Sequence, residues 1–78
     1  MAEAYMLIQT EVGRAEVVAK QVAALPGVLS SEYVTGPYDV VVRIGSDSDD
    51  DLTATVVPSI QQVGGITRTM TCPIAGGD

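Results

Sequence analysis

The chain has 78 residues and a formal net charge of −6, with 46% hydrophobic residues but no tryptophan, phenylalanine or histidine. This length suits one small domain, and such a domain often needs a partner subunit to complete its core. The acidic balance argues against sequence-independent binding to nucleic acid phosphates, which requires clustered lysine and arginine. No apolar run approaches the ~20 residues that a membrane-spanning helix needs.

The composition also narrows the available chemistry. The absence of histidine removes the commonest general base and metal ligand. The single cysteine, Cys72, excludes an internal disulfide and any zinc site built from several cysteines. We expect Cys72 to be a small buried hydrophobe in the last strand. The start of the chain has no basic region followed by a cleavage site, so a cytoplasmic protein is the default expectation.

The first predicted element is a strand over Tyr5 to Thr10. Both of its faces carry apolar side chains, which predicts a central strand covered on both sides. A helix follows, and the pair Glu16 and Lys20 lies on its outer side with the favourable i, i+4 orientation. Pro26-Gly27 ends this helix. Its predicted core face consists of Ala15, Val18, Val22 and Leu25.

The second strand is predicted over Val28 to Thr35, and its mixed faces are typical of an edge strand. Gly36-Pro37 then predicts a tight connection, because glycine accepts positive φ and proline presets φ near −65°. The third strand runs from Tyr38 to Ile44. Its core face at period 2 consists of Val40, Val42 and Ile44.

An acidic stretch, residues 45–51, separates this strand from the second helix. Its alternating aspartates resemble the start of a calcium loop, but the glycine at the sixth position and the glutamate at the twelfth are missing. Helix capping explains the pattern better. Asp47 or Ser48 can serve as N-cap, and the next aspartates fill a first turn where the macrodipole favours anions.

The second helix is predicted to end at Gly64-Gly65, and Pro58 should kink or interrupt it because proline lacks a backbone donor. The last strand is predicted over Ile66 to Ile74, with Pro73 marking the end of pairing or an edge. Ala75 to Asp78 should form a short frayed tail. The apolar face of the helix consists of Leu52, Val56, Ile60 and Val63. In the strand, Thr67, Thr69 and Thr71 lie opposite Ile66, Arg68, Met70 and Cys72.

The order strand, helix, strand, strand, helix, strand predicts an α+β, ferredoxin-like βαββαβ fold. Right-handed crossovers place both helices on one face of a four-stranded antiparallel sheet. The other face stays open, and a bare apolar patch of that kind calls for a partner. We therefore expect at least a dimer, a dimeric α+β sandwich, from one domain over residues 1–78. The predicted open face carries Leu7, Tyr33, Val41 and Met70, or their in-register neighbours.

Three segments resemble a known family. The turn Thr35 to Asp39 is similar to the Gly-x-Tyr-Asp turn of the effector-binding domain of the Lrp/AsnC regulators, also called the RAM domain. Leu25-Pro26-Gly27-Val28 precedes the strand that leads into this turn. Residues 63–71, Val-Gly-Gly-Ile-Thr-Arg-Thr-Met-Thr, resemble the closing strand of the family. The resemblance runs from about Tyr5 to Ile74.

The resemblance implies a sensor of small amino acids that modulates metabolism or transcription, without cofactor, metal or catalytic residues. Such domains pair sheet to sheet and assemble further, to an octamer or decamer, with an effector site at a contact between dimers. Family members normally carry a helix-turn-helix domain, and Met1 stands so close to the first strand that we expect a stand-alone form. Full-length Lrp/AsnC regulators are then possible partners, and no direct contact with nucleic acid or membrane is expected. The candidate ligand-binding residues are Thr35, Gly36, Pro37, Tyr38, Asp39, Thr69 and Thr71.

Two alternatives stay open. Ferredoxin-like dimers also house small monooxygenase-like enzymes of the dimeric α+β barrel type, although those need a polar pocket that usually contains histidine or asparagine, and this chain has neither. Asp39 has two interpretations as well. It is either a turn acid that accepts backbone hydrogen bonds, or a carboxylate that pairs the ammonium of an amino acid while hydroxyls and backbone N–H groups take the ligand's carboxylate.

Overall fold

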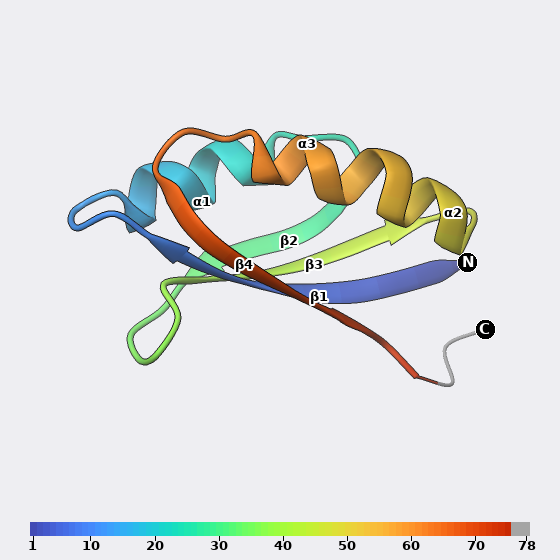
Figure 1. Cartoon of the computed structure of the whole chain (residues 1–78), viewed down its shortest axis with the longest axis horizontal. Coiled ribbons are helices and arrows are strands. Elements are labelled where there is room, and N and C mark those ends of the chain that lie inside the picture. The colour runs from blue at the N-terminus through green and yellow to red at the C-terminus, as the bar shows by residue number, and fades with distance from the viewer. Residues whose placement is uncertain (76–78) are drawn as a thin grey trace.

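The computed structural model describes residues 1–75, so nearly all of the expected tail, Ala75 to Asp78, lies outside the described residues. The fold is a two-layer α+β sandwich in which the helices cover one face of a four-stranded antiparallel sheet (Figure 1), and this confirms the ferredoxin-like prediction. The strand order is β2-β3-β1-β4. The elements are β1 (Ala2–Thr10), α1 (Ala15–Ala23), β2 (Val28–Tyr33), β3 (Val40–Ser46), α2 (Asp49–Asp51), η1 (Leu52–Val56), α3 (Val57–Gln61) and β4 (Ile66–Pro73).

The core lies between the central strands β1 and β3 and the helices. Met6 pairs with Val42, and Ala4 pairs with Ile44, so alternate side chains of both strands point toward the helices. Each of these side chains has no exposed surface. The period-2 pattern of the sequence therefore defines the covered face as predicted.

Val18 and Val22 of helix α1 are buried in this core, as the helical spacing of the apolar residues predicts. The amine of Lys20 lies 3.6 Å from the carboxylate of Glu16 on the outer surface. Both side chains are exposed, so this ion pair contributes little to stability. The chain leaves the helix through Gly27, whose φ of +87° is a conformation that side chains other than glycine rarely adopt.

The second helix runs without a break through α2, η1 and α3 (Figure 1). Ser48 caps it, because its hydroxyl oxygen accepts the backbone N–H of Asp51 at 3.0 Å. Pro58 does not interrupt the helix. The turn before it widens into the π-helical segment η1, in which the N–H of Val57 bonds to the carbonyl of Leu52. The missing N–H of Pro58 is thus accommodated by a wider turn rather than by a sharp kink.

Two bulges change which residues share a face. Between Val28 and Ser30 the register of β2 against β3 shifts, so Tyr33 pairs with the core residue Val40. The prediction that Tyr33 lies on the open face is therefore wrong, because one extra residue flips every later side chain. A second shift, between Gln9 and Thr10, pairs Thr10 with Ile66. Ile66 consequently packs against the core rather than beside Met70.

Strands β2 and β4 form the edges of the sheet, as the mixed faces of the first and Pro73 in the second indicated. Cys72 pairs with Tyr5 and is exposed, so the prediction of a buried thiol is wrong. Cys72 points to the uncovered face of the sheet from an edge strand, and no layer packs on that face within the chain to bury its side chain. No helix among residues 1–75 is both long and apolar enough to cross a lipid bilayer.

Candidate ligand-binding site

The loop between β2 and β3, residues 34–39, hangs from the sheet on the side away from the helices (Figure 1). Three hydrogen bonds of its backbone groups hold it in place. The N–H of Val34 bonds to the carbonyl of Asp39 at 2.8 Å, and the N–H of Asp39 bonds to the carbonyl of Ile8 at 2.8 Å. The side-chain amide of Gln9 donates to the carbonyl of Pro37 at 3.0 Å. The loop is thus attached to the end of β1 rather than free in solvent.

Asp39 connects the loop to a discontinuity in the neighbouring strand. Its Oδ2 accepts the backbone N–H of Thr10 at 2.7 Å in a partly buried position. Thr10 lies where the pairing of β1 with β4 shifts register. This N–H points to the same side of β1 as the carbonyl of Ile8, which accepts the N–H of Asp39, so the carboxylate satisfies a β1 donor that lies beyond the end of β3. Oδ2 thus has a structural partner, and Oδ1 accepts no hydrogen bond from residues 1–75.

Tyr38 links the same loop to the last strand. Its side chain is half-buried, and its hydroxyl donates to the sulfur of Met70 at 3.8 Å. Met70 in turn pairs with Leu7 on the uncovered face of the sheet. A molecule that displaces Tyr38 would therefore disturb the surface of this face.

The tip of the loop offers unused donors. Among residues 1–75, the backbone N–H groups of Thr35, Gly36 and Tyr38 have no hydrogen-bond partner within the chain. Thr35 and Gly36 are exposed, and Gly36 has a φ of +139° with open space around its Cα. Three backbone donors in one short loop, beside a carboxylate, match the two charged ends of an α-amino acid.

The two candidate threonines of β4 lie elsewhere. Thr69 pairs with Ile8 and Thr71 with Met6, so both face the helices, on the opposite side of the sheet from Met70. The hydroxyl of Thr69 accepts the side-chain amide of Gln61 at 3.1 Å. Within one chain, the structure brings together the five loop residues, Thr35 to Asp39, and separates them from Thr69 and Thr71 by the sheet.

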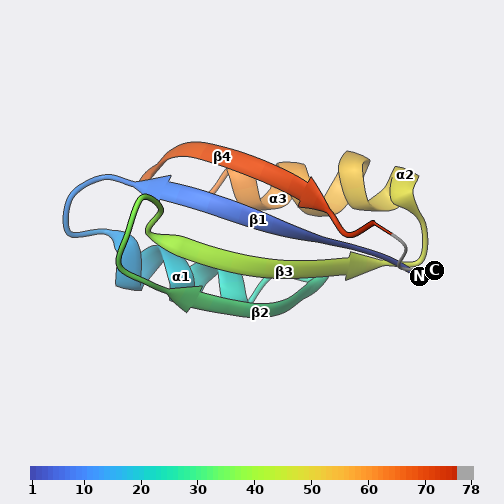
Figure 2. The same ribbon diagram turned by 90° about the horizontal axis from the view of Figure 1, so that it is seen from below.

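The uncovered face of the sheet, called here the open face, is turned toward the viewer in Figure 2, with the helices behind it. Its centre is apolar. Leu7 pairs with Val41 on one side and with Met70 on the other. Tyr5 retains 40% of its surface and Met70 43%. Leu7, Val41 and Met70 thus lie where the sequence placed them.

One ion pair crosses the open face, and the sequence analysis missed it. The Arg43 guanidinium binds the carboxylate of Glu3 and lies 5.7 Å from the centre of the Tyr5 ring. Hydrogen bonding and attraction to Glu3 raise the pKa of Arg43. Glu3 and Arg43 are forty residues apart, and only the β1–β3 register brings them together. This register therefore places two opposite charges at the edge of the apolar centre of the open face.

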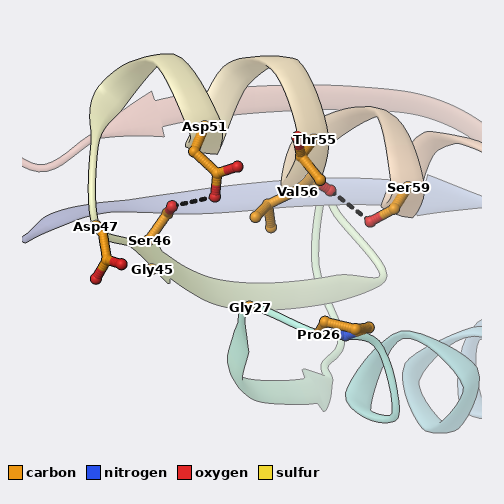
Figure 3. A pocket seen from close by; sticks show the side chains of 9 residues that line it. All are labelled: Pro26, Gly27, Gly45, Ser46, Asp47, Asp51, Thr55, Val56 and Ser59. Atoms are coloured by element: carbon orange, nitrogen blue, oxygen red, sulfur yellow. Dashed lines mark hydrogen bonds between the residues drawn. The ribbon is translucent and has the colours of Figure 1, made fainter.

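A separate hollow of about 300 Å³ lies at the far end of β3 (Figure 3). Its wall comes from the α1–β2 turn, the end of β3 and the second helix. The sequence analysis assigned Asp47 and Asp51 to the cap and first turn of the helix, gave no role to Thr55 or Ser59, and did not predict a hollow. No group of three or more His, Cys, Asp or Glu side chains within residues 1–75 is placed to hold a metal ion. The lining residues are Pro26, Gly27, Gly45, Ser46, Asp47, Asp51, Thr55, Val56 and Ser59.

Comparison with known proteins identifies the class. The model of the Lrp/AsnC ligand binding domain matches residues 3–75, so the chain belongs to this family. No curated protein sequence matches the chain. Among solved structures, TTHA0845 from Thermus thermophilus is 29% identical with a TM-score of 0.87, and the match covers 100% of this chain and 98% of that one.

Two further structures show the same fold at lower identity. AsnC from E. coli is 19% identical with a TM-score of 0.84, over 97% of this chain and 52% of that one. The transcriptional regulator NMB0573 from Neisseria meningitidis, solved as an L-Met complex, is 17% identical with a TM-score of 0.76, over 94% of this chain and 49% of that one. This chain thus spans about half the length of each regulator.

Proposed function

We propose that this domain binds a small amino acid at the loop 34–39 and self-associates through its open face. The observation that carries the proposal is the juxtaposition in this loop of three unpaired N–H groups and an aspartate with one uncommitted oxygen. Membership of the Lrp/AsnC ligand binding domain family supports a ligand-binding role. The L-Met complex of NMB0573 supports an amino acid as the class of ligand.

In this proposal the two ends of the ligand bind different groups. Asp39 pairs the ammonium with its free oxygen while its Oδ2 keeps the bond to Thr10. The N–H groups of Thr35, Gly36 and Tyr38 take the carboxylate. Thr69 and Thr71 lie across the sheet, so they join the site only if a neighbouring subunit supplies them. That arrangement agrees with an effector site at a contact between dimers.

The open face supplies the self-association. Two copies that pack sheet to sheet would cover Tyr5, Leu7, Val41 and Met70, which a chain of this size leaves in water. Tyr38 rests on Met70, so the ligand loop and the association surface share one contact. An effector at the loop would therefore alter assembly beyond the dimer.

The role is regulatory rather than catalytic in this proposal. The chain has neither histidine nor asparagine for a polar reaction pocket. Its four basic residues and net charge of −6 argue against direct contact with DNA. In this proposal the domain acts on metabolism or transcription through ligand binding or through co-assembly with full-length regulators.

A thermal-shift screen over the common amino acids tests the proposal. A ligand at about 100 times its dissociation constant should stabilise the fold by ~2.7 kcal/mol. Asp39→Asn keeps an oxygen for Thr10 but loses the charge, so effector affinity should fall by roughly one to two decades. If no amino acid raises the melting temperature, or if wild type and Asp39→Asn bind one equally well, the proposed site is wrong.

A further inference from the structure

The charged residues of the sheet all lie on the open face and balance each other there. Glu32 pairs with Val41, and Arg68 pairs with Gln9, two residues from Leu7 in β1, so both charged side chains project from this face. With the ion pair already described, the open face has two acidic and two basic side chains, and the four strands contain no other charged residue. This face therefore has no net charge, although the whole chain has a charge of −6. A second copy of this acidic chain meets the least repulsion here.

Glu32 and Arg68 are the two charges of the open face that have no partner among residues 1–75. Both residues are exposed, and neither forms an ion pair. They lie on the opposite edge strands β2 and β4 (Figure 2). At ~4.8 Å between neighbouring strands, three spacings put about 14 Å between the two edges, and the side chains of β3 and β1 stand between them. The two charges therefore cannot bind each other within one chain, but two copies packed face to face can pair both of them.

Two-fold symmetry allows two main ways to pack this face against itself. In both, the axis lies in the plane between the two sheets, and each contact occurs twice. An axis along the strands places β4 of one copy over β2 of the other, which brings Arg68 toward the partner's Glu32 at both edges. An axis across the strands places each edge strand over its own counterpart. Because β4 has no acidic residue and β2 has no basic residue, that arrangement leaves both charges unpaired.

The register agrees with the axis along the strands. Glu32 lies in one row across the sheet with Leu7 and Met70. Arg68 is two residues from Met70 in β4. Rotation about this axis preserves the position along the strands, so the two charges meet with an offset of about 7 Å, which their long side chains can span. The same rotation places Leu7 over the partner's Val41, and the contact then has an apolar centre and a charged rim, as protein interfaces do.

We propose that the open face binds a second copy of this chain with the two-fold axis along the strands, and that Arg68 and the partner's Glu32 set this orientation through reciprocal ion pairs. The inference rests on the self-association proposed above and adds its geometry. Charge pairs at the rim of an interface select the partner and the register more than they add affinity. In this orientation the loops 34–39 of both copies lie at the same end of the dimer.

Charge reversal of the full chain tests the pairing, with sedimentation equilibrium at low salt as the measurement. Arg68→Glu and Glu32→Arg each place like charges at both edges of the dimer, so each should weaken association at least ~tenfold. An equimolar mixture of the two variants should form a heterodimer within about threefold of the wild-type affinity, because each chain then meets the opposite charge at both edges. Lys20→Glu makes the same change in net charge as Arg68→Glu, but on the outer surface of α1, and should weaken association less than about twofold.

The outcomes separate the orientation from the association. A mixture as weak as its two components, beside a dimeric wild type, would overturn the orientation and leave the association in place. A wild-type chain that stays monomeric would contradict the association itself, and with it a second copy as the occupant of the open face. The losses in the single variants should shrink in about 1 M sodium chloride, where exposed charges are screened within a few ångströms. Losses that persist there would overturn the ionic origin of the orientation.

Discussion

The two faces of one sheet differ in what they do for this protein, although they are made by the same strands. On the covered face, Met6 and Ile8 of β1 have no exposed surface. On the open face, their chain neighbours Tyr5 and Leu7 lie beside exposed Met70 and Cys72. The comparison teaches that alternation in a central strand buries the side chains of one face in the core of the monomer and leaves the apolar side chains of the other face uncovered.

The largest effect is expected on the covered face. Ile8→Ala should destabilise the protein by about 3–4 kcal/mol, because it leaves a cavity under the helices. Urea denaturation followed by circular dichroism measures this change. Leu7→Ala, one residue along β1 on the open face, is the matched control and should cost much less at a protein concentration where the chain is monomeric. Equal losses at both positions would show that the two faces do not divide these roles.

The next effect is expected on the open face. Leu7→Glu places a charge between Val41 and Met70, so the proposed dimer should weaken by a factor of about 100, near 2.7 kcal/mol. Sedimentation equilibrium gives the dissociation constant. Val12→Glu adds the same charge at a fully exposed apolar position away from the strands, and it should leave association unchanged. A wild-type chain that stays monomeric at micromolar concentration would contradict the role of the open face.

Asp39 lies where the loop 34–39 joins the sheet, and a smaller effect is expected there. Asp39→Ala removes the acceptor of the Thr10 N–H and should destabilise the fold by about 1.5 kcal/mol. Asp39→Asn retains an oxygen at the same place and should change the free energy of unfolding by less than ~0.5 kcal/mol. Thermal denaturation of the pair separates the structural bond from the charge. A large loss in Asp39→Asn would mean that the charge itself stabilises the loop.

The smallest effect is expected at the ion pair of the open face. Arg43→Gln removes the partner of Glu3 and the cation beside Tyr5. Because the Arg43 guanidinium is exposed and screened by salt, association should weaken only about two- to fivefold at low salt. The difference should disappear in about 1 M sodium chloride, where the screening length is only a few ångströms. A loss that persists at high salt would indicate that the arginine contributes packing rather than charge.

The amino-acid sequence by itself determined the elements and the faces of the central strands. Val40, Val42 and Ile44 at period 2, and Val18 and Val22 at helical spacing, defined the core correctly, because these patterns depend only on local geometry. The same alternation put Met70 opposite Thr69 and Thr71. The residues of the loop were predicted together because they are adjacent in the chain.

Only the tertiary structure decided the register. The bulge at Leu29 moved Tyr33 to the covered side, and the shift at Thr10 moved Ile66 there. The course of the loop brought the Asp39 carboxylate to the backbone N–H of Thr10. The hollow beyond Gly45 required three separate segments to meet. Bulges, and contacts between distant segments, depend on packing between residues far apart in sequence, so no local pattern encodes them. Each one-residue shift in register moves the following side chains of that strand to the opposite face.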